Sequence, residues 1–166
     1  RYVYFSEDLY PGGSFQYNKD PNNRIFAIRR FDRQEGKLEN LIDINGGACR
    51  PQVSHNGKYL AFVRRVRTKS VLCVFNLETG EIKQVYDKLS KDQQEAWTIF
   101  GVYTGFNWTP DDKNIVIWAN GKIHKISVET GSDDVIPFKA NVQQKVAKTL
   151  TFENSAFDDK FEAKVI

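Results

Sequence analysis

The sequence contains few of the residues that build redox, metal and catalytic sites. Its 166 residues include no methionine, two cysteines and two histidines. Two cysteines, Cys49 and Cys73, do not make a disulfide framework, so we expect two buried or half-buried thiols. Two histidines, His55 and His124, cannot form a three-histidine zinc site, and neither has a partner at a ligand spacing. We therefore expect no metal and no cofactor in this segment.

Long apolar runs and a strong charge imbalance are also absent. No stretch is long enough to span a membrane. The 24 basic and 21 acidic residues leave a net charge of +3, which does not favour nucleic-acid binding. No nucleophile elbow, phosphate-binding loop or dinucleotide fingerprint occurs, so we expect no catalytic residue here. The remaining composition, 40% hydrophobic and 13% aromatic, suits a globular unit made of packed sheets.

The chain does contain a strand pattern that occurs twice, in residues 51–80 and in residues 106–131. Each copy has a short strand, a tight turn, an apolar strand, a hairpin, another strand and a glycine turn, and Ser54 corresponds to Thr109. The predicted strands are 52–54, 59–63, 71–75 and 82–86 in the first copy, and 106–109, 115–118, 123–128 and 134–138 in the second. A four-stranded unit that recurs at this spacing is typical of a β-propeller blade. An all-β sandwich with coincidental turns is the alternative, which the joint repeat of turn type and strand order disfavours.

Two stretches carry a resemblance to a known family. VSHNGKYLAFVR and NWTPDDKNIVIWANGKIHKISVETG are similar to the Ser-Pro-Asp-Gly-Lys motif of TolB-like (PD40, WD40-like) β-propellers. The chain departs from that motif at His55 and Asn56, where the family has Pro and Asp, and at Asp112, where it has Gly. The resemblance implies an all-β fold of four-stranded antiparallel blades, here a part of a six-bladed ring.

A narrower resemblance is to the propeller region of bacterial amidohydrolase-fusion proteins. It rests on YNKDPNNRIFAIRR, RPQVSHNGKYLAFVRRVRTKSV, QEAWTIFGVY and WANGKIHKI, which together cover most of residues 1–138. The resemblance implies a hydrolase barrel with a divalent metal elsewhere in the parent polypeptide, and a periplasmic or otherwise extracytoplasmic location. Nothing in this chain resembles that barrel.

We expect a single propeller fragment over residues 1–166. It divides into an incomplete blade without its first strand at 1–48, a blade with an insertion at 49–105, a compact blade at 106–138, and the start of a further blade at 139–166. The predicted strands outside the repeat are 1–6, 24–29 and 38–44, with further candidates at 149–152 and 161–166. Ser90, with Gln93 three residues later, favours one helical turn in the insertion.

The number of blades predicts an open ring. Because a blade takes roughly 40–45 residues, the chain holds between three and four of them, too few to close a ring comfortably. An open ring exposes edge strands, which tend to pair with other strands. The sequence also lacks an initiator methionine and a signal peptide. We expect a fragment whose partners are the rest of its own propeller and a hydrolase domain, or a fragment that self-associates.

Loop lengths predict which face of the propeller binds a partner. The long connections, 7–23, 64–69 and 87–105, all fall on one face, and the opposite face carries only short turns. Binding residues concentrate on loops that a rigid scaffold holds, so the first face is the candidate. Its candidate residues are a basic hairpin tip and an aromatic group, a composition typical of interfaces: Arg64, Arg65, Arg67 and Lys69, with Trp97, Phe100 and Tyr103. The alternative is a solvated hairpin, with aromatic side chains that fill a gap between blades.

These observations leave more than one function open. The resemblance implies a non-catalytic module for binding or positioning, as an accessory part of a larger amidohydrolase-like protein. The alternative is a stand-alone, TolB-like protein-interaction propeller of the cell envelope. A propeller with its own substrate pocket, as in lyases and peptidases, would need a histidine cluster that His55 and His124 alone do not supply.

Overall fold

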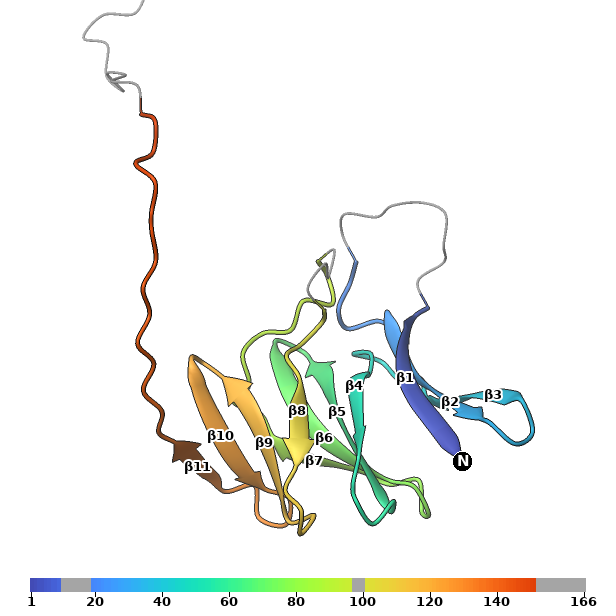
Figure 1. Cartoon of the computed structure of the whole chain (residues 1–166). Coiled ribbons are helices and arrows are strands. Elements are labelled where there is room, and N and C mark those ends of the chain that lie inside the picture. The colour runs from blue at the N-terminus through green and yellow to red at the C-terminus, as the bar shows by residue number, and fades with distance from the viewer. Residues whose placement is uncertain (10–18, 97–100, 152–166) are drawn as a thin grey trace, which may run out of the picture.

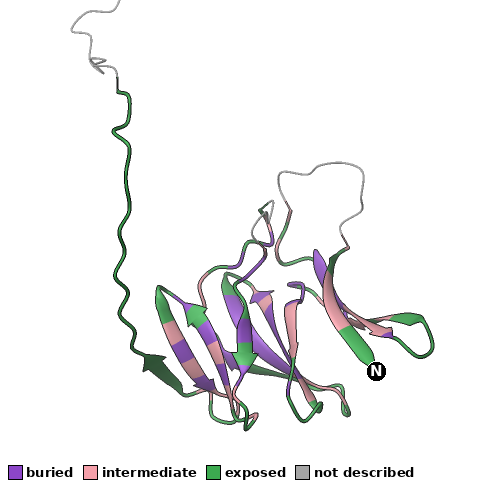
Figure 2. Cartoon of the chain, in the orientation of Figure 1, coloured by how far each residue is buried: buried purple, intermediate pink, exposed green. Residues whose placement is uncertain are grey.

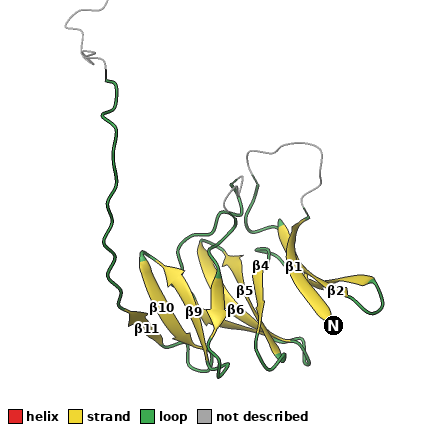
Figure 3. Cartoon of the chain, in the orientation of Figure 1, coloured by secondary structure: helices red, strands yellow, loops and turns green. Residues whose placement is uncertain are grey.

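The computed structural model describes residues 1–9, 19–96 and 101–151, which fold into strands and loops without a helix (Figure 3). Three antiparallel sheets follow one another along the chain (Figure 1). Blade 1 contains β1 (Tyr2–Asp8), β2 (Phe26–Asp32) and β3 (Lys37–Ile42). Blade 2 contains β4 (Cys49–Val53), β5 (Tyr59–Val66), β6 (Lys69–Asn76) and β7 (Ile82–Tyr86). Blade 3 contains β8 (Phe106–Trp108), β9 (Asn114–Ala119), β10 (Lys122–Ser127) and β11 (Asp133–Ile136).

The prediction of an all-β chain built from meandering blades is confirmed. In each sheet every strand pairs with its neighbour in the sequence, in the orders β1-β2-β3, β4-β5-β6-β7 and β8-β9-β10-β11. The predicted strand ends are close to the observed ones, because alternating side chains and glycine turns are local signals. β7 has the predicted bounds, whereas β5 runs on to Val66 and so takes in part of the predicted hairpin tip.

The predicted helical turn after Ser90 is wrong. Residues 89–93 have no regular structure, and the turn that follows begins only at Gln94. The backbone N–H of Asp92 donates to Ser70 Oγ at 2.7 Å, and that of Gln93 donates to the Val102 carbonyl at 2.9 Å. These bonds to other parts of the chain satisfy N–H groups that a helical turn would have used, so tertiary contacts outweigh the local helix signal.

The core consists of two apolar layers, one on each side of blade 2 (Figure 2). Alternate residues of β5 enter the two layers: Leu60 and Phe62 pack toward blade 1, and Ala61 and Val63 pack toward blade 3. All four have 0% exposure, which explains why residues 59–63 read as an unbroken apolar run. Cys49 and Cys73 are buried free thiols, one in each layer, as predicted. Burial raises the pKa of the Cys73 thiol to about 12.

The chain after blade 3 forms no strand as far as the structure describes it. Residues 137–151 are exposed and have no regular structure (Figure 2). The described part of the candidate strand 149–152 is therefore not a strand here. The rest of it and the candidate strand 161–166 lie outside the described residues, so a further blade remains a prediction.

Candidate binding face

The sheet topology places the long connections on one face, as the loop lengths predict. The described ends of the β1–β2 connection, the β5–β6 hairpin and residues 87–96 and 101–105 lie at the same end of the blades (Figure 1). We call this end the elaborated face. The turns 54–58 and 109–113 lie at the opposite end, the short-turn face.

The predicted basic tip is shorter and less uniform than its sequence indicates. Arg64 and Arg65 lie inside β5 and Lys69 begins β6, so only Arg67 and Thr68 form the turn. Arg67 is exposed, with a backbone φ of 54°. Lys69 is exposed and forms an ion pair with Asp87 at 2.5 Å. Arg64 is half-buried, and its guanidinium donates to the Asn45 carbonyl at 2.7 Å.

Arg65 is not a surface residue, which corrects its placement among the candidates. Its side chain is only 3% exposed, and the Asp92 carboxylate that faces it has 0% exposure. Arg65 Nε and one terminal nitrogen donate to the two Asp92 oxygens at 3.0 Å and 2.8 Å, a bidentate pair. Burial alone would lower the pKa of Arg65, but its hydrogen bonds and the charge of Asp92 raise it, so the guanidinium stays charged.

The Arg65–Asp92 pair fastens the insertion to blade 2. Ser70 Oγ donates to Asp92 Oδ2 at 2.6 Å, and the backbone N–H of Gln94 donates to Asp92 Oδ1 at 3.1 Å. Gln94 Nε2 then reaches the Gly46 carbonyl at 3.0 Å, and that carbonyl also accepts from the Arg65 backbone at 2.8 Å. A buried pair with these additional bonds fixes the position of residues 92–94 relative to blade 2. We call this network the anchor.

A glycine pair makes room for the anchor. A Cβ on Gly46, whose φ is 86°, would lie 1.9 Å from the Arg65 carbonyl oxygen. A Cβ on Gly47 would lie 2.2 Å from Gln94 Oε1. The local sequence around this pair does not indicate that role. The burial of Arg65 could have been predicted from its position in the strand. Because side chains alternate along β5, Arg65 lies on the same face as the core residues Ala61 and Val63.

Tyr103 fills a gap between blades. Like Arg65, it was placed among the surface candidates and is in fact buried. Its side chain is 6% exposed, and its hydroxyl donates to the Trp118 carbonyl at 3.0 Å. Its own carbonyl accepts from Arg50 Nε at 2.6 Å. Burial raises the pKa of Tyr103 to about 12, so the hydroxyl remains a donor at neutral pH. The other two aromatic candidates, Trp97 and Phe100, lie outside the described residues.

Six basic residues lie on the elaborated face of blades 2 and 3, five of them exposed and one, Arg64, half-buried. The β9–β10 turn meets the insertion, since Asn120 Nδ2 donates to the Lys88 carbonyl at 3.0 Å and the Asn120 N–H to Ser90 Oγ at 2.8 Å. Lys91 pairs with Glu95 at 2.5 Å, next to the anchor. We call the group the basic strip: Arg64, Arg67, Lys69, Lys88, Lys91 and Lys122.

Neither histidine belongs to a catalytic or metal arrangement in the described part of the chain. His124 is 6% exposed, with Nδ1 2.7 Å from Asp133 Oδ1 and Nε2 3.1 Å from the Ala119 carbonyl oxygen. It is a packed residue of β10. His55 lies on the short-turn face, and residues 1–9, 19–96 and 101–151 contain no group of three side chains that could hold a metal ion. No described helix is long and apolar enough to cross a membrane.

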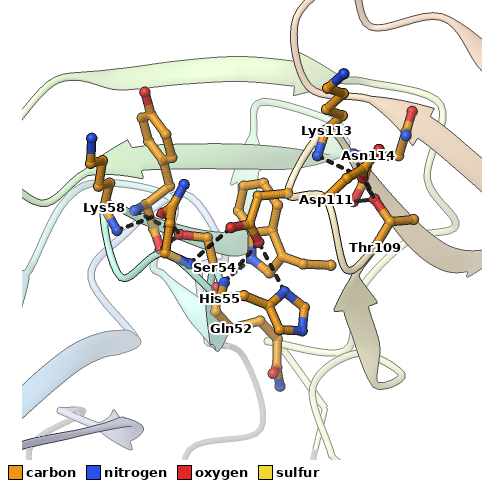
Figure 4. Close-up of polar contacts among 12 residues, drawn as sticks. Gln52, Ser54, His55, Lys58, Thr109, Asp111, Lys113 and Asn114 are labelled. Carbon is orange, nitrogen blue, oxygen red and sulfur yellow. Dashed lines mark hydrogen bonds and ion pairs between the residues drawn. The ribbon is translucent and has the colours of Figure 1, made fainter.

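The turns 54–58 and 109–113 on the short-turn face share one pattern of hydrogen bonds (Figure 4). In one turn Ser54 Oγ donates to Asn56 Oδ1 at 2.8 Å, and in the other Thr109 Oγ1 donates to Asp111 Oδ1 at 2.5 Å. Each of these acceptor oxygens also accepts the backbone N–H two residues later, at 2.9 Å and 3.1 Å. The motif residues therefore close the turns.

Asp112 gives the second turn an additional contact. It stands where the first turn has Gly57, with a φ of 55° that a non-glycine residue seldom adopts. Its carboxylate accepts from the backbone N–H groups of His55 and Asn56 at 2.7 Å and 2.8 Å, and lies 2.9 Å from His55 Nδ1. The departure from the family motif at this position thus joins blade 3 to blade 2.

Comparison with known proteins shows the fold. No protein-family model matches the chain, and no curated protein matches it in sequence. The chain is similar in structure to TolB from Acinetobacter baumannii, with a TM-score of 0.55, 13% identity, and coverage of 76% of this chain and 30% of that one. It is similar to the tricorn protease, with a TM-score of 0.57, 10% identity, and coverage of 87% and 12%. It is also similar to XC5397 from Xanthomonas campestris, described as a gluconolactonase, with a TM-score of 0.53, 10% identity, and coverage of 80% and 42%.

These likenesses establish the architecture and nothing finer. The chain spans less than half the length of each of the three proteins. Their descriptions differ in activity, so at this level of identity only the fold is shared. The chain is an all-β, open, partial β-propeller of antiparallel blades, similar to TolB-like propellers.

Proposed function

We propose that this chain is a non-catalytic binding module that holds an acidic surface of a partner domain on its basic strip. The observation that carries the proposal is the anchor. It fastens the start of the insertion to blade 2 through a buried charge pair, while the neighbouring cations of the strip remain in solvent. Loops that a rigid scaffold holds lose little conformational entropy when they bind a partner.

The positive charge of the strip indicates that the partner surface is acidic. Its six cations lie beside two exposed or half-exposed acids, Asp87 and Glu95, which pair with Lys69 and Lys91. Among the described residues, no acidic side chain lies within ion-pair distance of Arg67, Lys88 or Lys122, although the charge of Lys88 acts on Asp87 and Asp133. Unpaired surface cations steer an acidic partner toward the face and raise the association rate, with an effect that salt screens.

Two parent contexts fit a module of this kind. The sequence resemblance favours an accessory propeller of a metal-dependent amidohydrolase-like protein, in which the strip would position the hydrolase domain. The structural likeness to TolB favours a stand-alone interaction propeller of the cell envelope. Both contexts imply an extracytoplasmic location. The parent polypeptide separates them, because only the first continues into a barrel with a His-x-His metal motif.

A pair of charge-reversed variants tests the strip. The chain would be mixed with the separately produced remainder of its parent polypeptide, and the affinity measured by calorimetry at low and at physiological ionic strength. Arg67→Glu with Lys88→Glu should weaken binding by roughly tenfold or more at low salt, and the loss should shrink as salt rises. Thermal unfolding should stay nearly unchanged, because both side chains are exposed.

The matched control makes the same charge change on the short-turn face. Lys58→Glu with Lys113→Glu reverses two exposed cations there, and the strip keeps its full charge. Equal losses for the two variants would show a general charge effect and would remove the basic strip from the account. Binding that neither variant changes would do the same.

A further inference from the structure

Three asparagine residues of the described chain, Asn45, Asn56 and Asn120, are each followed by glycine, and each lies in a turn. Such a pair can close a succinimide ring, because glycine has no side chain to keep its backbone nitrogen away from the asparagine amide carbon. Water then opens the ring to aspartate or to its β-linked isomer. The sequence therefore contains three candidate sites of modification, and the contacts of each pair decide which of them reacts.

The glycine N–H of two of these pairs is already bonded. Gly46 N–H donates to the Asn22 carbonyl at 2.9 Å, and Gly57 N–H donates to the Ser54 carbonyl at 2.9 Å. Gly46 is also crowded, since a Cβ there would lie 1.9 Å from the Arg65 carbonyl oxygen. A nitrogen held in this way cannot reach the amide carbon without the loss of its hydrogen bond. The asparagine of each of these two pairs should therefore react slowly in the folded chain.

The third pair, Asn120 and Gly121, differs on each of these points. In the part of the chain that the structure describes, no carbonyl accepts the Gly121 N–H. A Cβ on Gly121 would meet nothing within 4 Å, so a ring has room to form there. The backbone φ values of 49° and 74° are those of a two-residue hairpin turn between β9 and β10. Asn120 is exposed, so water reaches the pair.

The surroundings of the Asn120 amide also favour the reaction. Ser90 Oγ donates to Asn120 Oδ1 at 3.3 Å, and Asn120 Nδ2 donates to the Lys88 carbonyl at 3.0 Å. A hydroxyl donor at Oδ1 stabilises the negative charge that develops on this oxygen when a nucleophile attacks the amide carbon. The insertion therefore holds the amide with a donor at the oxygen that becomes charged.

We propose that Asn120 is a site of spontaneous deamidation in the folded chain. The Gly121 nitrogen forms a bond to Asn120 Cγ, the bond from Cγ to Nδ2 breaks, and the amide nitrogen leaves as ammonia with the proton of the glycine nitrogen. Water then adds to one of the two ring carbonyl carbons, with its hydroxyl on the carbon and its proton on the released nitrogen. No group is oxidised or reduced, and water is the only co-reactant.

The product breaks the contact between blade 3 and the insertion. A carboxylate has no N–H to donate to the Lys88 carbonyl, and its oxygen faces a second acceptor there. The β-linked isomer also lengthens the backbone of the two-residue turn by a carbon atom. The β9–β10 turn thus loses its hold on Lys88 and Ser90, while the anchor at Asp92 keeps its own bonds. The proposal does not depend on the function proposed for the basic strip.

Peptide mapping by mass spectrometry tests the proposal on the chain as it stands. The folded chain is incubated in mildly alkaline buffer, and deamidation at the three asparagine–glycine pairs is followed in the same sample. Asn120 should react at least roughly fivefold faster than Asn45 and Asn56, whose glycine nitrogens must first lose a hydrogen bond. In denaturant the three rates should come within roughly twofold of one another, because the folded contacts are then absent.

Two outcomes would overturn the proposal. One is an equal rate at the three pairs in the folded chain, because the contacts of Gly121 would then not select the site. The other is the same preference for Asn120 in denaturant, because the selection would then come from the neighbouring sequence.

A matched pair of variants tests the consequence for the turn. Asn120→Asp mimics the product and should speed hydrogen exchange of the residue-120 amide, which donates to Ser90 Oγ at 2.8 Å, at least roughly threefold. Asn56→Asp is the control, since Asn56 Oδ1 only accepts hydrogen bonds and a carboxylate can replace it. The control should leave exchange at residue 120 unchanged. Unchanged exchange at residue 120 in Asn120→Asp would contradict the predicted loss of contact with the insertion.

Discussion

Blades 2 and 3 share one pattern of strands but differ in how much of it is covered. Val63 in blade 2 and Trp118 in blade 3 occupy corresponding positions, because Ser54 corresponds to Thr109. Val63 has 0% exposure, whereas Trp118 is 41% exposed. Among the described residues, blade 2 has a neighbouring sheet on each side, and blade 3 has one on the side of blade 2 alone. Each face of a blade is therefore buried only when another blade covers it.

The open face of blade 3 still carries apolar residues. Trp118, Ile123 and Ile136 form a cross-strand row over three neighbouring strands. Blade 1 has a similar row on the side away from blade 2, formed by Val3, Phe31 and Leu38. Rows of this kind favour a further sheet on each side, in keeping with an open, partial ring.

The first prediction contrasts a covered position with an open one. Phe62→Ala removes a fully buried ring between blades 1 and 2, and should lower the free energy of unfolding by about 4 kcal/mol through lost burial and a cavity. Trp118→Ala should cost less, about 2 kcal/mol in the isolated chain, because 41% of that residue is already exposed to solvent. Chemical denaturation measures both. Similar losses for the two variants would mean that the open face is covered in solution.

The second prediction concerns the anchor, which only blade 2 has among the described sheets. Asp92→Ala leaves the Arg65 guanidinium buried without its carboxylate partner, and should destabilise the chain by about 3 kcal/mol. The double variant Arg65→Met with Asp92→Leu should regain most of that loss, because replacing both charges removes the desolvation penalty. Glu95→Ala is the control, since its side chain is 27% exposed and it should cost less than about 1 kcal/mol. A double variant as unstable as Asp92→Ala would contradict this reading of the pair.

The third and smallest prediction concerns the contact that joins the turns of blades 2 and 3. Burial alone would raise the pKa of Asp112, but hydrogen bonds from the backbone and side chain of His55 and from the Asn56 backbone outweigh it and lower the pKa. Its stabilising effect is therefore present above the ordinary carboxyl pKa of about 4, and is lost as pH falls through the lower value in the folded chain. Asp112→Asn should lower Tm by about 2 to 4 °C at neutral pH, and asparagine tolerates the positive φ.

The pH dependence separates the carboxylate from the rest of the turn. The difference in Tm between the parent chain and Asp112→Asn should shrink steadily as the solution is acidified below about pH 4. Asp134→Asn, at an exposed position of β11, should leave Tm nearly unchanged throughout. A Tm difference for Asp112→Asn that is independent of pH would show that the turn conformation, and not the charge, joins the two blades.

Much of the fold was predictable because its signals are local. The strands of blades 2 and 3 follow from two-residue alternation and from turns such as Asn120-Gly121, which need only a few consecutive residues. The candidate site was less predictable. Arg65 reads as part of a basic tip in the sequence, and its burial depends on Asp92, which lies 27 residues further along the chain. Tyr103 was likewise misplaced, since its partner Trp118 belongs to the next blade.

The departure from the TolB-like motif at Asp112 likewise reflects a contact with a distant part of the chain. Asp112 in place of glycine looks like a weaker turn when residues 109–113 are read alone. The structure shows a carboxylate that bonds to the backbone of a turn 56 residues earlier in the sequence, at Asn56. Contacts over such distances are fixed by packing of whole blades, and no local pattern reports them.

The most direct test of the account is native-state hydrogen exchange over residues 87–96, because the proposed binding face depends on an insertion that blade 2 holds rigidly. The Asp92 and Gln94 amides, bonded to Ser70 Oγ and to the Asp92 carboxylate, should exchange about as slowly as nearby amides of β5 and β6. Asp92→Asn should speed their exchange at least roughly tenfold, while the β5 and β6 amides change less. Fast exchange at Asp92 and Gln94 in the unmodified chain would contradict the account, because the basic strip would then have no rigid support.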